Sequence, residues 1–102
     1  MAKKLSWQVT VTTAGTAVQG DSTGSGWYVI KANPANTGKG YVGNDGSDDV
    51  SATTGFILDA GEQIPMLLES LSDIWFDTAV NGEKFVITVM ELPLHAAMFN
   101  LS

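Results

Sequence analysis

Apolar and polar residues alternate near the start of the sequence. In residues 6–13, Trp7, Val9 and Val11 occupy one side of the alternation, while serine, glutamine and threonine residues occupy the other. A period of two over this length predicts a β-strand with one buried side and one side in solvent. Residues 27–30 are aromatic or β-branched throughout, a composition that also favours a strand.

Turn-forming residues follow this second strand. Residues 33–38 contain two asparagines, a proline and a glycine, and a short strand is predicted after them at 41–42. Asparagine, proline and glycine each favour reversal of the chain, for different backbone reasons. The pattern therefore predicts a hairpin over residues 27–46, with a loop of about six residues.

Four further strands are predicted at residues 55–58, 63–68, 74–77 and 83–91. Pro65 has no amide hydrogen, so its strand is expected at a sheet edge or to begin around the proline. The pair Asn81-Gly82 is the strongest hairpin signal in the chain and predicts pairing of the two strands around it.

About seven short strands, with turn signals roughly every ten residues, predict an all-β fold. We expect a single-domain β-sandwich with jelly-roll-like topology over residues 1–102, and a small barrel is the alternative. Residues 1–5 are expected to form an N-terminal arm. Residues 92–102 form a C-terminal tail, for which a final strand, a short helical turn and an arm all stay open.

Apolar side chains on both faces set the later strands apart from the first. Strand 83–91 places Phe85, Ile87 and Val89 on one face and Val86, Thr88 and Met90 on the other. Residues 66–68 and 74–76 likewise carry large apolar groups on both faces. Because an antiparallel sheet buries one face in its own core, the second face needs cover. The candidates are the tail, a second copy of the chain or a foreign partner.

Composition narrows the classes of partner and of chemistry. The chain has no cysteine and a formal charge of −6, and its five basic residues are all lysines. Nucleic acid is not an expected partner, because phosphate backbones are bound by clustered basic groups. No apolar run approaches the ~20 residues of a membrane span, and residues 6–13 are too polar for a signal peptide. We expect a soluble protein made in the cytoplasm, with no membrane partner.

Candidate catalytic and metal sites are weak. His95 is the only histidine and lies in the apolar tail, where a surface or interface role is expected. An oxygen-rich loop could hold Ca²⁺, but it lacks EF-hand spacing and a closing glutamate; its members are Asn44, Asp45, Asp48 and Asp49. Residues 37–39 resemble the end of a P-loop, yet Asn33 stands where the first glycine belongs. We predict no enzyme activity, no metal and no cofactor.

Three segments carry a resemblance to a known family: VIKANPANTGKGYVGNDG at 29–46, TTGFILDAGEQIPMLL at 53–68 and LSDIWFDTAVNGEKFVITV at 71–89. Their order resembles small β-sandwich structural proteins of tailed bacteriophage virions, of the capsid decoration (cement) type. The shared features are an Ala-x-Pro-x-Asn-x-Gly loop, a Gly-Phe-x-Leu-x-x-Gly-Glu turn and an Asp-Ile-Trp-x-Asp-x-x-x-x-Gly segment. The resemblance implies a protein that binds copies of itself and the capsid surface, with no catalytic residues to transfer.

The expected function follows from this resemblance and from the two-faced strands. We expect a homo-oligomer, with a trimer favoured, that binds the major capsid protein on the outer surface of the head. The expected location is the virion. Expected self-interface residues are Trp75, Phe76, Val86 and Met90. Expected capsid-facing residues are Asn33, Pro34, Asn36, Thr37, Lys39, Met98 and Phe99. The alternative is a tail- or fibre-associated structural or glycan-binding module, in which Trp27, Tyr28 or Tyr41 contacts the sugar.

Overall fold

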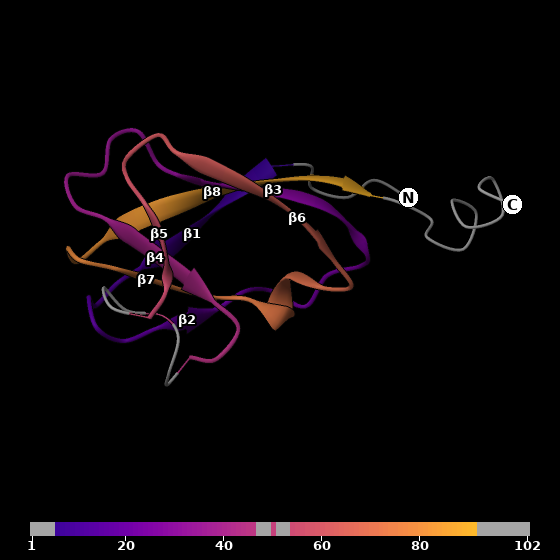
Figure 1. Ribbon diagram of the computed structural model, residues 1–102, viewed down its shortest axis with the longest axis horizontal. Coiled ribbons are helices and arrows are strands. Elements are labelled where there is room, and N and C mark those ends of the chain that lie inside the picture. Colours follow the sequence, from indigo (N-terminus) through magenta and orange to yellow (C-terminus); the bar gives the residue numbers. More distant parts are fainter. Residues whose placement is uncertain (1–5, 47–49, 51–53, 92–102) are drawn as a thin grey trace, which may run out of the picture.

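Two antiparallel sheets packed face to face make up the fold (Figure 1). The computed structural model describes residues 6–46, 50 and 54–91, and these residues form eight strands and one 3-10 helix. The elements are β1 Ser6–Val11, β2 Val18–Gln19, β3 Gly26–Ala32, β4 Gly40–Gly43, β5 Phe56–Leu58, β6 Gln63–Leu68, η1 Leu71–Asp73, β7 Trp75–Thr78 and β8 Glu83–Glu91.

The order of the strands is that of a jelly roll. Sheet A has the order β1-β8-β3-β6, and sheet B has the order β2-β7-β4-β5. The first strand thus pairs with the last, the second with the seventh, the third with the sixth and the fourth with the fifth. The predicted β-sandwich with jelly-roll-like topology is confirmed, and the barrel alternative is wrong.

Both predicted hairpins are wrong. Strand β3 lies in sheet A and β4 in sheet B, so residues 33–39 cross from one sheet to the other. The same holds for β7 and β8 on either side of Asn81-Gly82. Turn residues reverse the direction of the chain, but they do not decide which sheet receives the next strand. In the described residues, only β4 and β5 are consecutive strands that pair with each other.

The core lies between the sheets and follows the period of two. Val9 and Val11 of β1 are buried, while Ser6, Gln8 and Thr10 are exposed, as the alternation predicts. The rings of Phe76 and Phe85 meet across the two sheets with centroids 5.0 Å apart. The buried cluster consists of Val9, Val11, Tyr28, Ile30, Ala32, Val42, Leu58, Leu71, Ile74, Phe76, Phe85 and Ile87.

Sheet A ends in β1 on one side and β6 on the other. Strand β6 contains Pro65, which lies opposite Val29 of β3. A proline can be accommodated there because an edge strand needs hydrogen bonds on one side only. The predicted edge position of this strand is confirmed.

Candidate functional site

The loop between β3 and β4 is the most elaborate turn of the described chain. The side chain of Asn33 accepts a hydrogen bond from the backbone N–H of Ala35 at 2.9 Å. The carbonyl of Asn33 accepts a second one from Asn36 N–H, also at 2.9 Å. Pro34 has its φ fixed by its ring at the next position of this turn. The turn is therefore held by its own residues before any other part of the chain contacts it.

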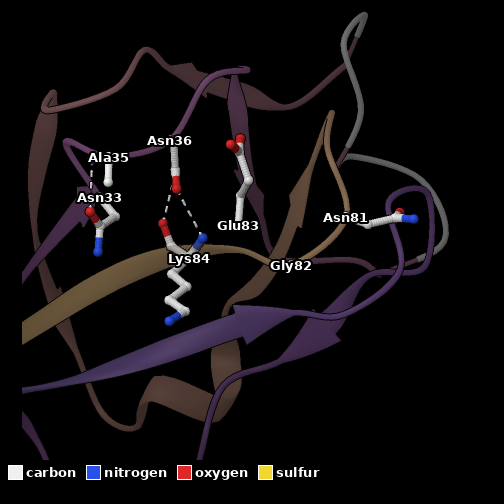
Figure 2. Close-up of a pocket in the computed structure, with 7 residues that line it drawn as sticks. All are labelled: Asn33, Ala35, Asn36, Asn81, Gly82, Glu83 and Lys84. Atoms are coloured by element: carbon white, nitrogen blue, oxygen red, sulfur yellow. Dashed lines mark hydrogen bonds between the residues drawn. The ribbon is translucent and has the colours of Figure 1, made fainter.

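Asn36 fastens the loop to the start of β8. Its amide nitrogen donates to the carbonyl of Lys84 at 2.8 Å, and its amide oxygen accepts from Lys84 N–H at 3.1 Å. Figure 2 shows both bonds as dashed lines between the two residues. The Asn36 side chain thus bonds the backbone of Lys84 as a neighbouring strand would. It therefore stabilises the fold and also fixes the position of the loop.

Glu83 holds the next part of the loop. Its carboxylate accepts from Thr37 N–H at 2.5 Å, from the Thr37 hydroxyl at 2.9 Å and from Gly38 N–H at 3.0 Å. Partial burial raises the pKa of the Glu83 carboxyl, but the three hydrogen bonds outweigh this effect and leave the pKa below its usual value. We call these contacts of Glu83 the clasp.

A shallow polar pocket of about 320 Å³ lies beside the clasp. It is lined by Asn33, Ala35, Asn36, Asn81, Gly82, Glu83 and Lys84. Asn81 turns away from the other labelled side chains in Figure 2, and its amide oxygen accepts from Ala14 N–H at 2.8 Å. The lining offers hydrogen-bonding groups and one charge of each sign, which suits contact with a polar protein surface.

The loop residues predicted to face a capsid divide into two groups. Pro34, Thr37 and Lys39 are exposed, although Thr37 also donates to Glu83 and Lys39 pairs with Asp59. The side chains of Asn33 and Asn36 are half-buried and hydrogen-bonded within the fold. Met98 and Phe99 lie outside the described residues.

Lys39 is exposed and is held by an ion pair. Its ammonium lies 2.5 Å from the carboxylate of Asp59, and the side-chain hydrogen bond and the charge of Asp59 raise the pKa of Lys39. Asp59 belongs to the turn at residues 59–62, so the pair links the loop to that turn. We name the combined surface of residues 33–39 and 81–84 the loop platform.

A second candidate surface lies at the other end of sheet A. Tyr28 and Ile30 point into the core, so Trp27 and Val29 face outward. Trp27 lies opposite Met90 on β8 and opposite Leu67 on β6, which places three apolar side chains side by side. Their exposed fractions are 41% for Trp27, 62% for Met90 and 55% for Leu67. We name these three residues the apolar row.

The predicted self-interface residues lie on different surfaces. Met90 belongs to the apolar row, and half-buried Val86 lies on the same outer face of sheet A. Trp75 is on the outer face of sheet B. Phe76 is fully buried in the core, so its assignment to an interface is wrong. Adjacent residues of a strand point to opposite faces, and the register decides which of Trp75 and Phe76 is inside.

Around Trp75 and Asp77, the outer face of sheet B is covered by the chain itself, while Ile57 on the same face is 39% exposed. A Cβ atom added to Gly46 would lie 2.4 Å from the Trp75 ring, which shows how closely the backbone approaches the indole. The carboxylate of Asp77, on the same face, is buried and accepts from Gly15 N–H at 3.0 Å and from Thr78 N–H at 2.8 Å. The loops before β2 and after β4 thus contact this face.

The aromatics predicted for glycan binding are mostly unavailable to a ligand. Tyr28 is 1% exposed, and its hydroxyl donates to the Gly24 carbonyl at 2.6 Å. Tyr41 is buried as well. These two assignments are wrong, because alternation in β3 places Tyr28 in the core, and Tyr41 is buried on the outer face of sheet B, opposite Asp77. Trp27 is the one of the three that is exposed.

The remaining features considered are the oxygen-rich loop after β4, His95 and a possible membrane span. Asn44 and Asp45 are exposed in the loop after β4, while Asp48, Asp49 and His95 lie outside the described residues. Within residues 6–46, 50 and 54–91, no group of three acidic or histidine side chains is placed to hold a metal ion. No helix in this part of the chain is long and apolar enough to cross a membrane.

Sequence reasoning missed two features of these surfaces. The sequence shows apolar residues on both faces of 66–68, but only the pairing register shows that Leu67 lies beside Trp27. Sequence reasoning also gave no role to Glu83, which contacts Thr37 across 46 positions of sequence. Comparison with protein-family models, with curated proteins and with solved structures gave no match to this chain.

Proposed function

We propose that this protein is a capsid decoration (cement) protein of a tailed bacteriophage. It oligomerises, as a trimer, and binds the outer surface of the major capsid protein lattice, where it stabilises the head. The observation that supports this most is the apolar row, in which three exposed apolar side chains lie side by side on an acidic chain. A contiguous exposed apolar surface of this kind is typical of interaction sites.

The positions of the two candidate surfaces support a protein with two kinds of contact. Strand β3 begins beside the apolar row at Gly26 and ends at Ala32, next to the loop platform. Seven residues of strand separate the two ends by about 20 Å. One end can therefore bind another copy while the other end rests on a capsid subunit. Many copies on one lattice add avidity, so each contact can be weak.

Self-association is tested by light scattering on the purified chain. The expected mass is three times the 10.8 kDa of one chain. Leu67→Lys should lower this mass toward that of one chain, because it places a charge in the apolar row. Phe56→Lys is the matched control: Phe56 is 52% exposed, close to the 55% of Leu67, but it lies on sheet B. A single-chain mass for the unmodified protein would overturn the oligomer.

Capsid binding is tested by sedimentation with heads that lack this chain, assembled from the major capsid protein of the same phage. Binding should saturate at a fixed ratio to the capsid protein. Ala35→Arg should weaken it, because Ala35 is exposed in the loop platform. Ser22→Arg adds the same charge on an exposed loop near the other end of sheet A and should bind normally. Absence of saturable binding by the unmodified chain would overturn the decoration role.

The glycan-binding alternative has one exposed aromatic left, Trp27. Sugar recognition combines an aromatic face with hydrogen-bonding groups for the hydroxyls. The neighbours of Trp27 across the strands are Met90 and Leu67, which offer none. The apolar row therefore suits a protein partner better than a carbohydrate.

A further inference from the structure

We propose that residues 92–102 of one chain dock on the apolar row of a second copy, an inference that rests on the self-association proposed above and assigns its contact. The occupant of the row is thus the C-terminal tail of a neighbour. Each copy would supply one tail and receive another, and such head-to-tail contacts close into a ring when the rotation allows it.

The row is suited to an extended apolar segment. Trp27, Met90 and Leu67 come from three adjacent strands, so they form a strip across the sheet. Val29 and Pro65 form the next pair on the same face, two residues further along β3 and β6, and both are also apolar. The described part of the chain leaves all three members of the row at least 41% exposed.

The tail has matching chemistry and begins beside the row. Its sequence, LPLHAAMFNLS, has no aspartate, glutamate, lysine or arginine, and five of its eleven residues are leucine, methionine or phenylalanine. It follows Glu91, which pairs with Gly26 directly next to the Met90 and Trp27 pair. Eleven extended residues reach up to about 36 Å. That exceeds the roughly 10 Å across three strands, so the tail can bridge to a neighbour and still cover its row.

The direction of β8 favours a neighbour over the same chain. The residue before a proline, here Leu92, is biased away from the helical region toward extended conformations. Covering its own row would require an immediate reversal. Described tight turns use glycine at positive φ, as at Gly15 and Gly61, or a polar side chain that bonds the backbone, as in Asn33 and Ser70. Residues 92–99 contain no glycine, asparagine or aspartate.

Disulfide trapping tests this contact, because the natural chain contains no cysteine. Full-length chains carrying Leu67→Cys are mixed with chains carrying Phe99→Cys, oxidised, and analysed by mass spectrometry of the linked peptides. The mixed pair should exceed the Phe56→Cys with Phe99→Cys control by at least about tenfold, as expected for thiols held at millimolar effective concentration. Leu94→Cys provides a second tail position.

The outcomes separate this inference from the proposed function. Cross-linking of the mixed pair above the control supports docking on a second copy. A double variant that cross-links only within one chain overturns it, because the tail then covers its own row. No cross-link above the control from either tail position also overturns it. If light scattering still gives an oligomer in that case, the proposed self-association stands without the tail contact; a single-chain mass overturns both.

Discussion

The outer faces of the two sheets differ in how they are completed. On sheet B, the backbone at Gly46 packs on the ring of Trp75, and the carboxylate of Asp77 is buried under hydrogen bonds from neighbouring residues. On sheet A, Trp27 stands exposed between Met90 and Leu67. Each face carries a tryptophan; among the described residues, a loop packs on that of sheet B, while that of sheet A is 41% exposed. The described part of the fold thus combines a tryptophan packed under a loop with a tryptophan exposed among apolar neighbours.

Replacing Trp75 and Trp27 by alanine, one at a time, should give the largest difference in stability between the two faces. Trp75→Ala should lower the free energy of unfolding by about 2–3 kcal/mol, because it empties space beneath Gly46. Trp27→Ala should cost about 1 kcal/mol or less, because its ring is already partly in water. Urea unfolding followed by circular dichroism, at concentrations where the protein is monomeric, measures both. Equal losses would mean that the two faces are equally closed.

Gly46→Ala tests the same contact on sheet B by changing the loop in place of the Trp75 ring. The added methyl carbon would lie 2.4 Å from the Trp75 ring, too close for two carbon atoms, so the loop or the ring must move. Such overpacking should cost about 1–3 kcal/mol in the same urea measurement. Combining Gly46→Ala with Trp75→Leu should recover part of the loss. Additive losses would show that the loop does not rest on this ring.

Glu83→Gln tests whether the loop end of sheet A is closed as firmly as sheet B. The variant removes the charge that accepts three hydrogen bonds, and we expect a loss of about 1–2 kcal/mol at pH 7. Hydrogen exchange should increase at Thr37 and Gly38, whose N–H groups donate to the carboxylate.

Acid should remove the difference in unfolding free energy between the natural chain and Glu83→Gln. The pKa of Glu83 is lower in the folded protein than its usual value of 4.5, so the clasp is fully stabilising above that pH. Its contribution is lost as the pH falls through the folded pKa. The gap in unfolding free energy between the natural chain and Glu83→Gln should therefore narrow below about pH 4.5. A gap that stays constant from pH 7 to pH 3 would contradict the role of the charge.

Met90→Gln should have the smallest effect on the single chain, less than about 0.5 kcal/mol, because Met90 is the most exposed member of the apolar row. Its effect should instead appear in the concentration dependence. The unfolding midpoint of the natural chain should rise with protein concentration, since association stabilises the folded state. The midpoint of Met90→Gln should rise less. Identical concentration dependence would exclude Met90 from the contact.

Local pattern was sufficient to predict most of the strands. The period of two gave the buried side of β1, and β8 runs over the predicted residues 83–91. Pro65 placed its strand at an edge because the missing donor is a property of the residue itself. These features depend on a few neighbouring positions, and the sequence contains all of them.

Features that depend on pairing between distant segments could not be predicted. The turns at residues 33–38 and at Asn81-Gly82 were recognised, but their sheet crossings follow from how the whole chain wraps. Trp75 and Phe76 are adjacent and both large, and nothing local says which one is inside. The clasp and the apolar row join residues far apart in sequence. Only the register brings them together.

Strand order also sets when this protein can fold. Strand β8 lies between β1 and β3, and β7 lies between β2 and β4, so the last strands described hold interior places in both sheets. During synthesis, β1 has no partner until β8 has left the ribosome. Folding should therefore begin only when β8 has emerged, and it should be slow, as is usual when contacts are far apart in sequence. A nascent chain halted before residue 83 would lack the partner of β1 and remain exposed to aggregation.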